Sequence, residues 1–489
     1  MKQKSLKTNA FFSFLKAFMD IVFPVISFPY ASRILSPAGI GRINFSNSIT
    51  AYFAMIAGLG VTTYATREVA RIRENKNELN KFCKEILIIN FFSSIAAYVL
   101  FAFSLIFVRK FDSYRILLIL SSSTVLFRAL SMSWFYAGFE NFKLITIRTT
   151  VFQVISLVFL FVFVRESSDL VEYMIFGLIT PIGCNAFNFI YAMRLVDLRC
   201  KCRLEFKKHL KQMFVFWGMS FVTTIYETLD SSFLGFLSTD SEVGYYSAAI
   251  KINRMVLMLL VSISGILLPR LSLYAEKKDD LSFYRLIHKS FGINFIIAFP
   301  CAAGLFVLSE PIVRLFSGEQ YLPAVVLMQL MTLLVPIISL SNLIGGQILP
   351  ALKKEKLCFI SYITGASVNL VFNSALIPLF GAFGAGIASV IAESCVLLVQ
   401  LVFFAKISSE PKISSDVIKN LLHSLFSTLI MSVFVFFVMR ITEGFGLVLQ
   451  IFISIFAGCI VYCISLLLLR NSYIHEWIGI IRSTIRKKY

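Results

Sequence analysis

Long apolar runs separated by short basic segments constrain this chain more than any other feature. A transmembrane helix needs about 20 predominantly apolar residues to cross the hydrocarbon core of a bilayer. We identify fourteen such runs in the 489 residues. They are 9–30, 43–64, 86–108, 116–137, 144–164, 171–193, 213–237, 245–268, 290–308, 323–347, 358–379, 383–404, 420–440 and 446–470. The chain is 58% hydrophobic and only 15% charged, whereas a soluble globular protein is about 45–50% apolar and about 25% charged. The sequence therefore predicts an all-α polytopic membrane protein.

The positions of lysine and arginine predict the orientation of the spans. An even number of spans places both termini on one side of the membrane. The segments on that side carry 33 of the 46 Lys and Arg residues, and those on the other side carry 8. Cytoplasmic loops are the ones that carry excess positive charge, so we expect both termini in the cytoplasm. The net charge of +19 falls largely in these loops and therefore indicates no nucleic-acid partner.

An internal repeat predicts the domain organisation. Gly41 and Gly244 align at the starts of two spans, and Lys143 aligns with Lys356 at a similar offset. Two six-helix halves with two added helices would give such offsets, and repeated halves are the usual construction of secondary transporters. The predicted parts are an N-terminal lobe (1–193), a basic cytoplasmic linker (194–212), a C-terminal lobe (213–404), two further helices (420–470) and an amphipathic cytoplasmic tail (471–489).

Nine charged side chains lie inside the predicted spans, where each costs about 2.5–3.5 kcal/mol at mid-bilayer. They are Lys16, Asp20, Arg128, Arg148, Glu227, Asp230, Lys251, Arg254 and Glu393. Most of them share a helix face with another charge, because residues three or four apart are neighbours on a helix surface. Polar stripes on helices at equivalent positions of the two halves favour a water-filled cavity. The alternative is that these charges pair with each other and only hold the helices together.

The cations in such a cavity would favour an anionic substrate. Diphosphate is the natural candidate, because arginine presents a planar fork of donors to its oxygens. The predicted substrate-binding cations inside the spans are Lys16, Arg128, Lys251 and Arg254. The carboxylates Asp20, Glu227 and Asp230 would hold those cations in place or carry a coupling ion, a proton or sodium.

The sequence indicates no cofactor and no catalytic centre. Cys200, Cys202 and His209 form a cluster that lacks a fourth ligand at zinc-like spacing, so we expect no metal. The chain also contains no G-x-x-x-x-G-K-[ST] nucleotide-binding motif. Energy for transport would then come from an ion gradient or from mass action.

Five stretches together resemble the bacterial Wzx-type polysaccharide flippases of the multidrug/oligosaccharidyl-lipid/polysaccharide (MOP) exporter superfamily. They are FPYASRILSPAGIGRINFSNSI (28–49), GLGVTTYATREVARIR (58–73), WFYAGFENFKLITIR (134–148), LFSGEQYLPAV (315–325) and GAFGAGIASVIAE (381–393). The resemblance covers about residues 5–470, and the stretch that begins WFY is its most specific part.

The resemblance implies two six-helix lobes in a V with helices 13 and 14 appended. It implies that the protein flips undecaprenyl-diphosphate-linked oligosaccharides across the bacterial inner membrane by alternating access, for O-antigen, capsule or exopolysaccharide synthesis. Lys16, Lys251 and Arg254 match the family's cavity cations by helix position only. Arg33 and Arg42 would lie at the outer mouth, and Arg67 with Glu68 at a cytoplasmic gate. The implied partners are membrane lipids, a polysaccharide polymerase and chain-length proteins.

Three other functions remain open at this point. A lipid II flippase and a cation-coupled multidrug antiporter belong to the same superfamily. A membrane polysaccharide polymerase or ligase belongs to another class, and such enzymes usually present a large outer loop with catalytic Arg or His. The longest outer loop here has about 14 residues (309–322) and holds no histidine, so we expect a transporter that is not an enzyme.

Overall fold

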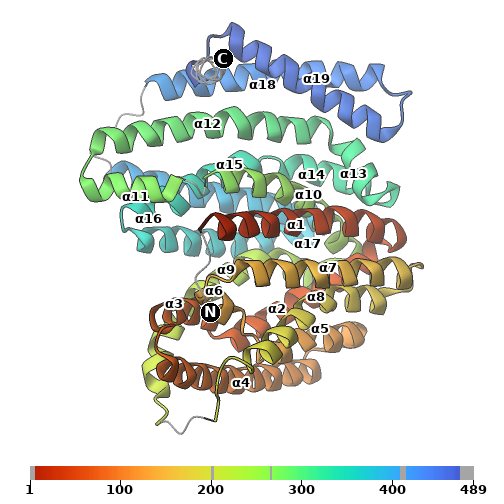
Figure 1. Cartoon of the computed structure of the whole chain (residues 1–489). Helices are drawn as coiled ribbons and strands as arrows, with labels where there is room; N and C mark the ends of the chain where they lie inside the picture. The colour runs from red at the N-terminus through yellow and green to blue at the C-terminus, as the bar shows by residue number, and fades with distance from the viewer. Residues whose placement is uncertain (1–5, 200–202, 265–266, 408–414, 474–489) are drawn as a thin grey trace. The chain divides into compact units, whose positions relative to one another are not determined.

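The computed structural model describes residues 6–199, 203–264, 267–407 and 415–473, and all regular structure in these ranges is helical. This confirms the predicted all-α class. The chain divides into two compact units, Met1–Gly244 and Tyr245–Tyr489, each of which can be followed by colour in Figure 1. The predicted lobes, linker and helix pair stay predictions. Most of the predicted tail, residues 474–489, lies outside the described residues.

The first unit contains the helices up to α9 and the start of α10. They are α1 (Leu6–Ile34), α2 (Pro37–Gly58), α3 (Val61–Ile72), α4 (Lys76–Phe107), the 3-10 helix η1 (Arg109–Tyr114), α5 (Arg115–Arg128), α6 (Ser133–Gly138), α7 (Phe142–Phe163), α8 (Leu170–Ala192), α9 (Phe206–Leu237) and α10 (Asp240–Ser264).

The second unit contains the rest of α10 and all later helices. They are α11 (Leu267–Lys277), α12 (Asp280–Val307), α13 (Ser309–Ser317), the 3-10 helix η2 (Glu319–Tyr321), α14 (Ala324–Met331), α15 (Leu334–Ser341), the π-helix η3 (Asn342–Ile348), α16 (Leu349–Ala351), α17 (Glu355–Ile407), α18 (Ser415–Ile441) and α19 (Leu447–Leu468).

These helices make the chain a multi-pass membrane protein. Within the described residues, ten helical segments are long and apolar enough to cross a membrane. One of them, α17, is 53 residues long and carries two predicted spans, between which Gly381 leaves the helical conformation at φ 55°. Two further predicted spans coincide with α9 and α10, which are 32 and 25 residues long. The exact count of fourteen stays a prediction.

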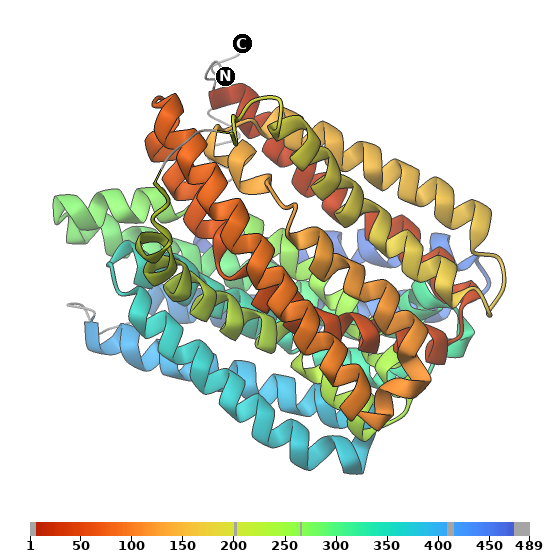
Figure 2. The same ribbon diagram turned by 90° about the horizontal axis from the view of Figure 1, so that it is seen from below.

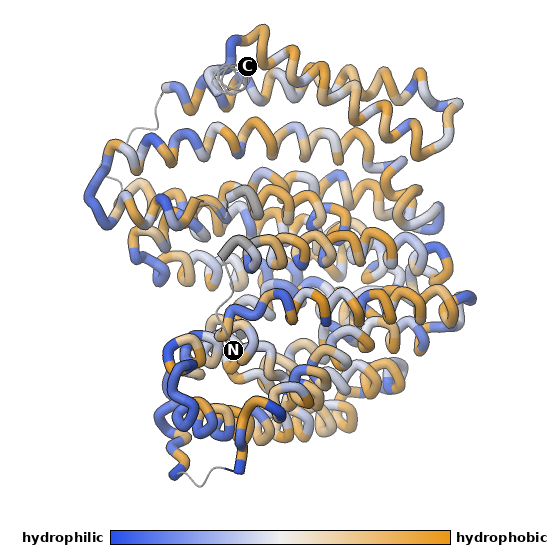
Figure 3. Tube along the Cα trace, viewed as in Figure 1, coloured by the Kyte–Doolittle hydropathy of each residue, from blue (hydrophilic) through white to orange (hydrophobic). Residues whose placement is uncertain are grey.

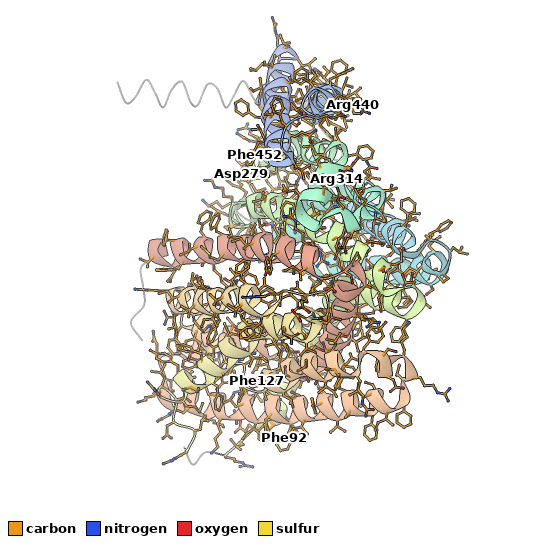
Figure 4. The ribbon with its side chains drawn as sticks, turned by 90° about the vertical axis from the view of Figure 1, so that its right-hand side faces the viewer. Phe92, Phe127, Asp279, Arg314, Arg440 and Phe452 are labelled. Carbon is orange, nitrogen blue, oxygen red and sulfur yellow. The ribbon has the colours of Figure 1, made fainter. Side chains whose placement is uncertain are left out.

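The apolar surface of the helices faces outward, as a lipid environment requires. Figure 3 shows orange, hydrophobic stretches along the helices and blue, hydrophilic residues mainly near their ends. Phe92 on α4 and Phe452 on α19, both labelled in Figure 4, are 64% and 68% exposed. Exposing so much apolar surface to water would be unfavourable in free energy, whereas lipid tails cover it without that cost.

Helix α2 is the central element of the first unit. It packs against α4, α5 and α9, while α8 packs on α5, α7 on α8 and α1 on α7. Helix α4 runs beside α2 and α5 as one long helix, which is seen at the bottom of Figure 1 and in front in Figure 2. In the second unit, α12 packs on α15 and α18, and α19 packs on α18.

The two glycines that align in the predicted repeat lie against each other's helices. A Cβ on Gly41 of α2 would overlap the backbone carbonyl of Asp240, and a Cβ on Gly244 of α10 would overlap that of Pro37. The two glycines thus let α2 and the start of α10 approach closely at this crossing. The same crossing is held by Arg42, whose Nε lies 2.9 Å from the Asp240 carboxylate, and by a hydrogen bond from the Tyr114 hydroxyl to that carboxylate.

We predict that Gly41→Ala lowers the stability of the protein by about 1–3 kcal/mol, because the added methyl group would meet fixed backbone. Gly177→Ala on α8 is the matched control: nothing lies within 4 Å of its Cβ position, so it is expected to be neutral or stabilising. Thermal unfolding of the detergent-solubilised protein measures both. Equal midpoints for the two variants would show that the crossing is not tightly packed.

Candidate functional site

A cavity of about 560 Å³ lies within the first unit and is lined by α2, α3, α5 and α9. Its lining contains one guanidinium, one carboxylate and several hydroxyl groups. The polar lining residues are Thr62, Thr63, Arg128, Ser220, Thr223, Thr224, Glu227 and Thr228. The cavity therefore combines a basic side chain, an acidic side chain and neutral hydrogen-bonding groups in one space.

The first helix break at the cavity separates α2 from α3. Leu59 and Gly60 both adopt left-handed conformations, with φ 38° and φ 70°. Gly60 is required for a second reason, because a Cβ there would lie only 2.5 Å from the Met213 carbonyl oxygen of α9. The break falls inside the predicted span 43–64, and the whole segment Pro37–Ile72 is still long and apolar enough to cross a membrane. The glycine pair in AGLGVTT (57–63) is the sequence signal for the break.

The second break ends α5 at Arg128. The next residues form i→i+3 bonds, with the N–H of Ser131 donating to the carbonyl of Arg128 at 2.9 Å. Trp134, Phe135 and Tyr136 of α6 then bury three consecutive rings, each at most 2% exposed. The buried WFY stretch thus fixes the chain just after the break. Arg128, the last residue before the break, lines the cavity. Sequence reasoning placed Arg128 in mid-span without this break.

Helix α4 forms side-chain hydrogen bonds to both breaks. The Asn90 amide donates to the carbonyl of Arg128 at 2.7 Å, and the Ser93 hydroxyl donates to that of Ala57 at 2.7 Å. The Arg128 carbonyl also accepts from the N–H of Ser131, so it has two partners. Carbonyl groups in hydrocarbon need such partners, and these bonds therefore stabilise the breaks.

Arg128 and the start of α3 bring hydrogen-bond donors to the cavity. The guanidinium of Arg128 packs over Gly58, where a Cβ would lie 2.8 Å from Nη2, and no described carboxylate lies within 4.0 Å of it. The first turn of α3 has no side-chain cap in the described structure, and its residues Thr62 and Thr63 line the same cavity. Free N–H groups at a helix N-terminus favour negative charge, and a guanidinium adds a planar fork of donors.

A buried hydrogen-bond chain fastens the start of α9 beside this cavity. His209 Nε2 lies 2.7 Å from Glu85 Oε2, and its Nδ1 lies 2.7 Å from the Tyr64 hydroxyl. The Glu85 carboxylate also accepts from the N–H of Glu205 at 2.6 Å. We predicted no metal from His209 with Cys200 and Cys202; those cysteines lie outside the described residues, and the role of His209 with Glu85 escaped the sequence analysis.

Lys16 and Asp20 of α1 pair with each other. Lys16 Nζ lies 2.5 Å from Asp20 Oδ2, and each side chain is 39% exposed. Gln153 of α7 donates to the other oxygen of Asp20 at 3.3 Å. Neither residue is among those lining the cavity, so the structure brings Lys16 and Asp20 together with Gln153 and not with Arg128. Substrate binding by Lys16 stays a prediction.

The other predicted residues of the first unit lie elsewhere. Arg33 and Arg42 are exposed, and Arg42 is bonded to Asp240. Arg67 is exposed on α3, while Glu68 pairs with Arg71 at 2.5 Å and not with Arg67. Their roles as outer contacts and as a gate stay predictions.

Three further predicted residues are not among those lining the cavity. Asp230 is buried on α9. Lys251 and Arg254 lie on α10 in the second unit, where Arg254 is exposed. Their roles as a coupling carboxylate and as substrate-binding cations stay predictions.

Comparison with known proteins identifies the family. The profile of the polysaccharide biosynthesis protein family matches residues 6–275, more than half of the chain. The chain belongs to this family. A second profile, MatE, matches residues 217–374. Together they confirm the resemblance drawn from the sequence: the chain is a Wzx-type member of the MOP exporter superfamily.

Two curated relatives are similar over most of their length. A protein of Shigella dysenteriae named "Putative O-antigen transporter" is 26% identical, with 81% of this chain and 99% of the relative covered. A protein of the same name from Escherichia coli K12 is 22% identical, over 82% of this chain and 96% of the relative. Both are named transporters, which agrees with the expected non-enzymatic role.

Solved structures share the fold of this member of the polysaccharide biosynthesis family. The lipid II flippase MurJ in an inward closed conformation superposes with a TM-score of 0.75 at 18% identity, over 96% of this chain and 100% of that one. An inward-facing multidrug MATE transporter superposes with a TM-score of 0.62 at 12% identity, over 83% and 99%. At these identities the likeness shows the fold alone.

We predict that the Lys16–Asp20 pair can be reversed. Lys16→Asp with Asp20→Lys keeps one charge of each sign, and the Gln153 amide can turn its oxygen to the new lysine. The single changes Lys16→Met and Asp20→Asn leave one charge unpaired and are expected to lower membrane abundance. Quantitative immunoblots of membranes measure all three. A reversed variant as scarce as the singles would contradict a simple pairing role.

Proposed function

We propose that this protein flips an undecaprenyl-diphosphate-linked oligosaccharide from the inner to the outer leaflet of the bacterial cytoplasmic membrane, with both termini in the cytoplasm. The product would serve the synthesis of a surface polysaccharide such as O-antigen, capsule or exopolysaccharide. The family and the relatives named as O-antigen transporters support this proposal. The structural observation that carries it is the guanidinium of Arg128 beside the uncapped start of α3 in a cavity of about 560 Å³.

The chemistry of the cavity fits the part of the substrate that is hardest to move. A diphosphate carries concentrated negative charge, which cannot enter hydrocarbon without compensation. Arg128 supplies a permanent positive charge with several donors, and the first turn of α3 supplies further N–H groups. Hydroxyl groups on α9 give the sugar hydrogen-bond partners in place of water. Alternating access would then carry the diphosphate and sugar across, while the lipid chain stays in the bilayer.

The remaining predicted groups belong to this proposal as well. Lys251 and Arg254 are proposed further cation contacts, and Arg33 and Arg42 are proposed contacts at the outer mouth. A proton or sodium gradient is the proposed energy source, with Asp230 as a candidate carrier. Membrane lipids, a polysaccharide polymerase and chain-length proteins are the proposed partners.

Substitution of Arg128 tests the proposal. In a strain that lacks the gene, we expect complementation by Arg128→Gln to reduce export of the lipid-linked glycan at least about tenfold, because charge-assisted hydrogen bonds to the diphosphate are lost. Arg128→Lys keeps the charge without the fork and is expected to retain partial export. Surface glycan staining measures export, and immunoblots measure membrane abundance.

Arg115→Ala is the matched control, because this arginine is exposed at the other end of the same helix. It is expected to export normally. Normal export by Arg128→Gln at normal abundance would exclude the cavity as the diphosphate site. The family assignment would stand in that case.

A further inference from the structure

Glu227 is the carboxylate in the cavity, and the function proposed above gives it no role. It lies on α9, is exposed, and lines the same space as Arg128. No described cation lies within 4.0 Å of it, so it does not serve as the counter-charge of the arginine. An acidic group that faces a cavity without a partner is available to a ligand.

Two of the four α9 hydroxyl groups that line the cavity already use their hydrogens within the helix. The Thr223 hydroxyl donates to the carbonyl of Met219 at 3.0 Å, and the Thr228 hydroxyl donates to that of Thr224 at 2.7 Å. Each hydroxyl has one hydrogen, so what remains on these two oxygens is acceptor capacity. An ionised carboxylate is likewise only an acceptor. Glu227 and these two threonines therefore offer acceptors to the cavity, while the hydroxyls of Ser220 and Thr224 can also donate.

The lining thus contains two groups of residues with different hydrogen-bonding character. Arg128 and the first turn of α3 supply donors, whereas Glu227, Thr223 and Thr228 on α9 supply acceptors. Phosphate oxygens are acceptors and are repelled by a carboxylate, so they suit only the donating group. A polyhydroxylated group joined to the phosphate suits the accepting group, because each sugar hydroxyl has a hydrogen to donate.

We propose that Glu227 is a sugar-recognition residue that accepts hydrogen bonds from hydroxyl groups of the sugar attached to the diphosphate. This inference rests on the proposed function, because it assumes that the diphosphate lies at Arg128. It assigns two parts of one substrate to two groups of residues that line one cavity. Glu227 then distinguishes a glycosylated lipid diphosphate from the bare lipid diphosphate, which lacks the sugar.

Binding of two probes by the purified full-length protein tests this inference. The probes are farnesyl diphosphate and the same lipid diphosphate carrying one glucose. Glu227→Gln is expected to weaken binding of the glucosylated probe about tenfold, because hydrogen bonds to a charged acceptor are replaced by weaker ones to an amide. Binding of farnesyl diphosphate is expected to stay the same or to strengthen, because a nearby negative charge is removed. The ligand-induced shift of the thermal unfolding midpoint measures both affinities.

The controls separate this inference from the proposed function. Arg128→Gln is expected to weaken both probes, and Glu166→Gln, an exposed carboxylate in the α7–α8 loop, is expected to change neither. If Arg128→Gln changes neither probe, the proposed diphosphate site is wrong. If Arg128→Gln weakens both while Glu227→Gln weakens both equally or neither, only the sugar-recognition role is overturned. Loss of sodium or proton dependence of export in Glu227→Gln, with probe binding unchanged, would also overturn it in favour of ion coupling.

Discussion

The first unit depends on one constraint: polar backbone and charged groups placed in hydrocarbon must find partners. Two of its helices stop short, at Gly58 and at Arg128, and a carbonyl group beside each stop accepts a side-chain hydrogen bond. Asn90 and Ser93, one turn apart on the unbroken helix α4, donate to those carbonyls. Non-helical backbone at this depth persists only where protein or a water-filled cavity surrounds it, and here both conditions hold. The breaks, the capping side chains and the cavity are therefore parts of one arrangement.

This arrangement gives the cavity its chemical asymmetry. Helix α5 ends at Arg128, and the side chain of this arginine lines the cavity. A helix that starts without a capping side chain leaves N–H groups free. Both features line the cavity, to which α9 contributes Glu227 and two hydroxyls, Thr223 and Thr228, whose hydrogens are already used within the helix. The buried His209–Glu85 bond matters in this context because it fixes the first turn of the helix that carries the accepting group.

The sequence predicted the fold class well because hydropathy reports directly on the bilayer. Long apolar runs and the bias of Lys and Arg depend only on the solvent around each residue, so they require no knowledge of packing. The helix breaks are different. Gly60 lies against the backbone of α9, and the end of α5 is followed by the buried rings of α6 and is bonded to Asn90. These are contacts between distant segments, which spacing along the chain does not reveal.

The same distinction explains the outcome at the candidate site. Arg128 and Glu227 were recognised because a charge inside an apolar run has a large free-energy cost, whichever way its side chain points. Arg128 and Glu227 line one cavity because α5 ends at the break. Lys16 and Asp20 lie with Gln153 because α1 packs against α7. Glu85 and His209 were overlooked because both lie in basic, polar segments, where a charged residue is common and gives no functional signal.

The most direct test of this account is an experimental structure of the protein with a bound undecaprenyl-diphosphate-linked sugar. The account predicts phosphate density within hydrogen-bonding distance of the Arg128 guanidinium and of the N–H groups of residues 61–63, with the sugar against α9. Phosphate density elsewhere, with the cavity at Arg128 empty, would contradict it.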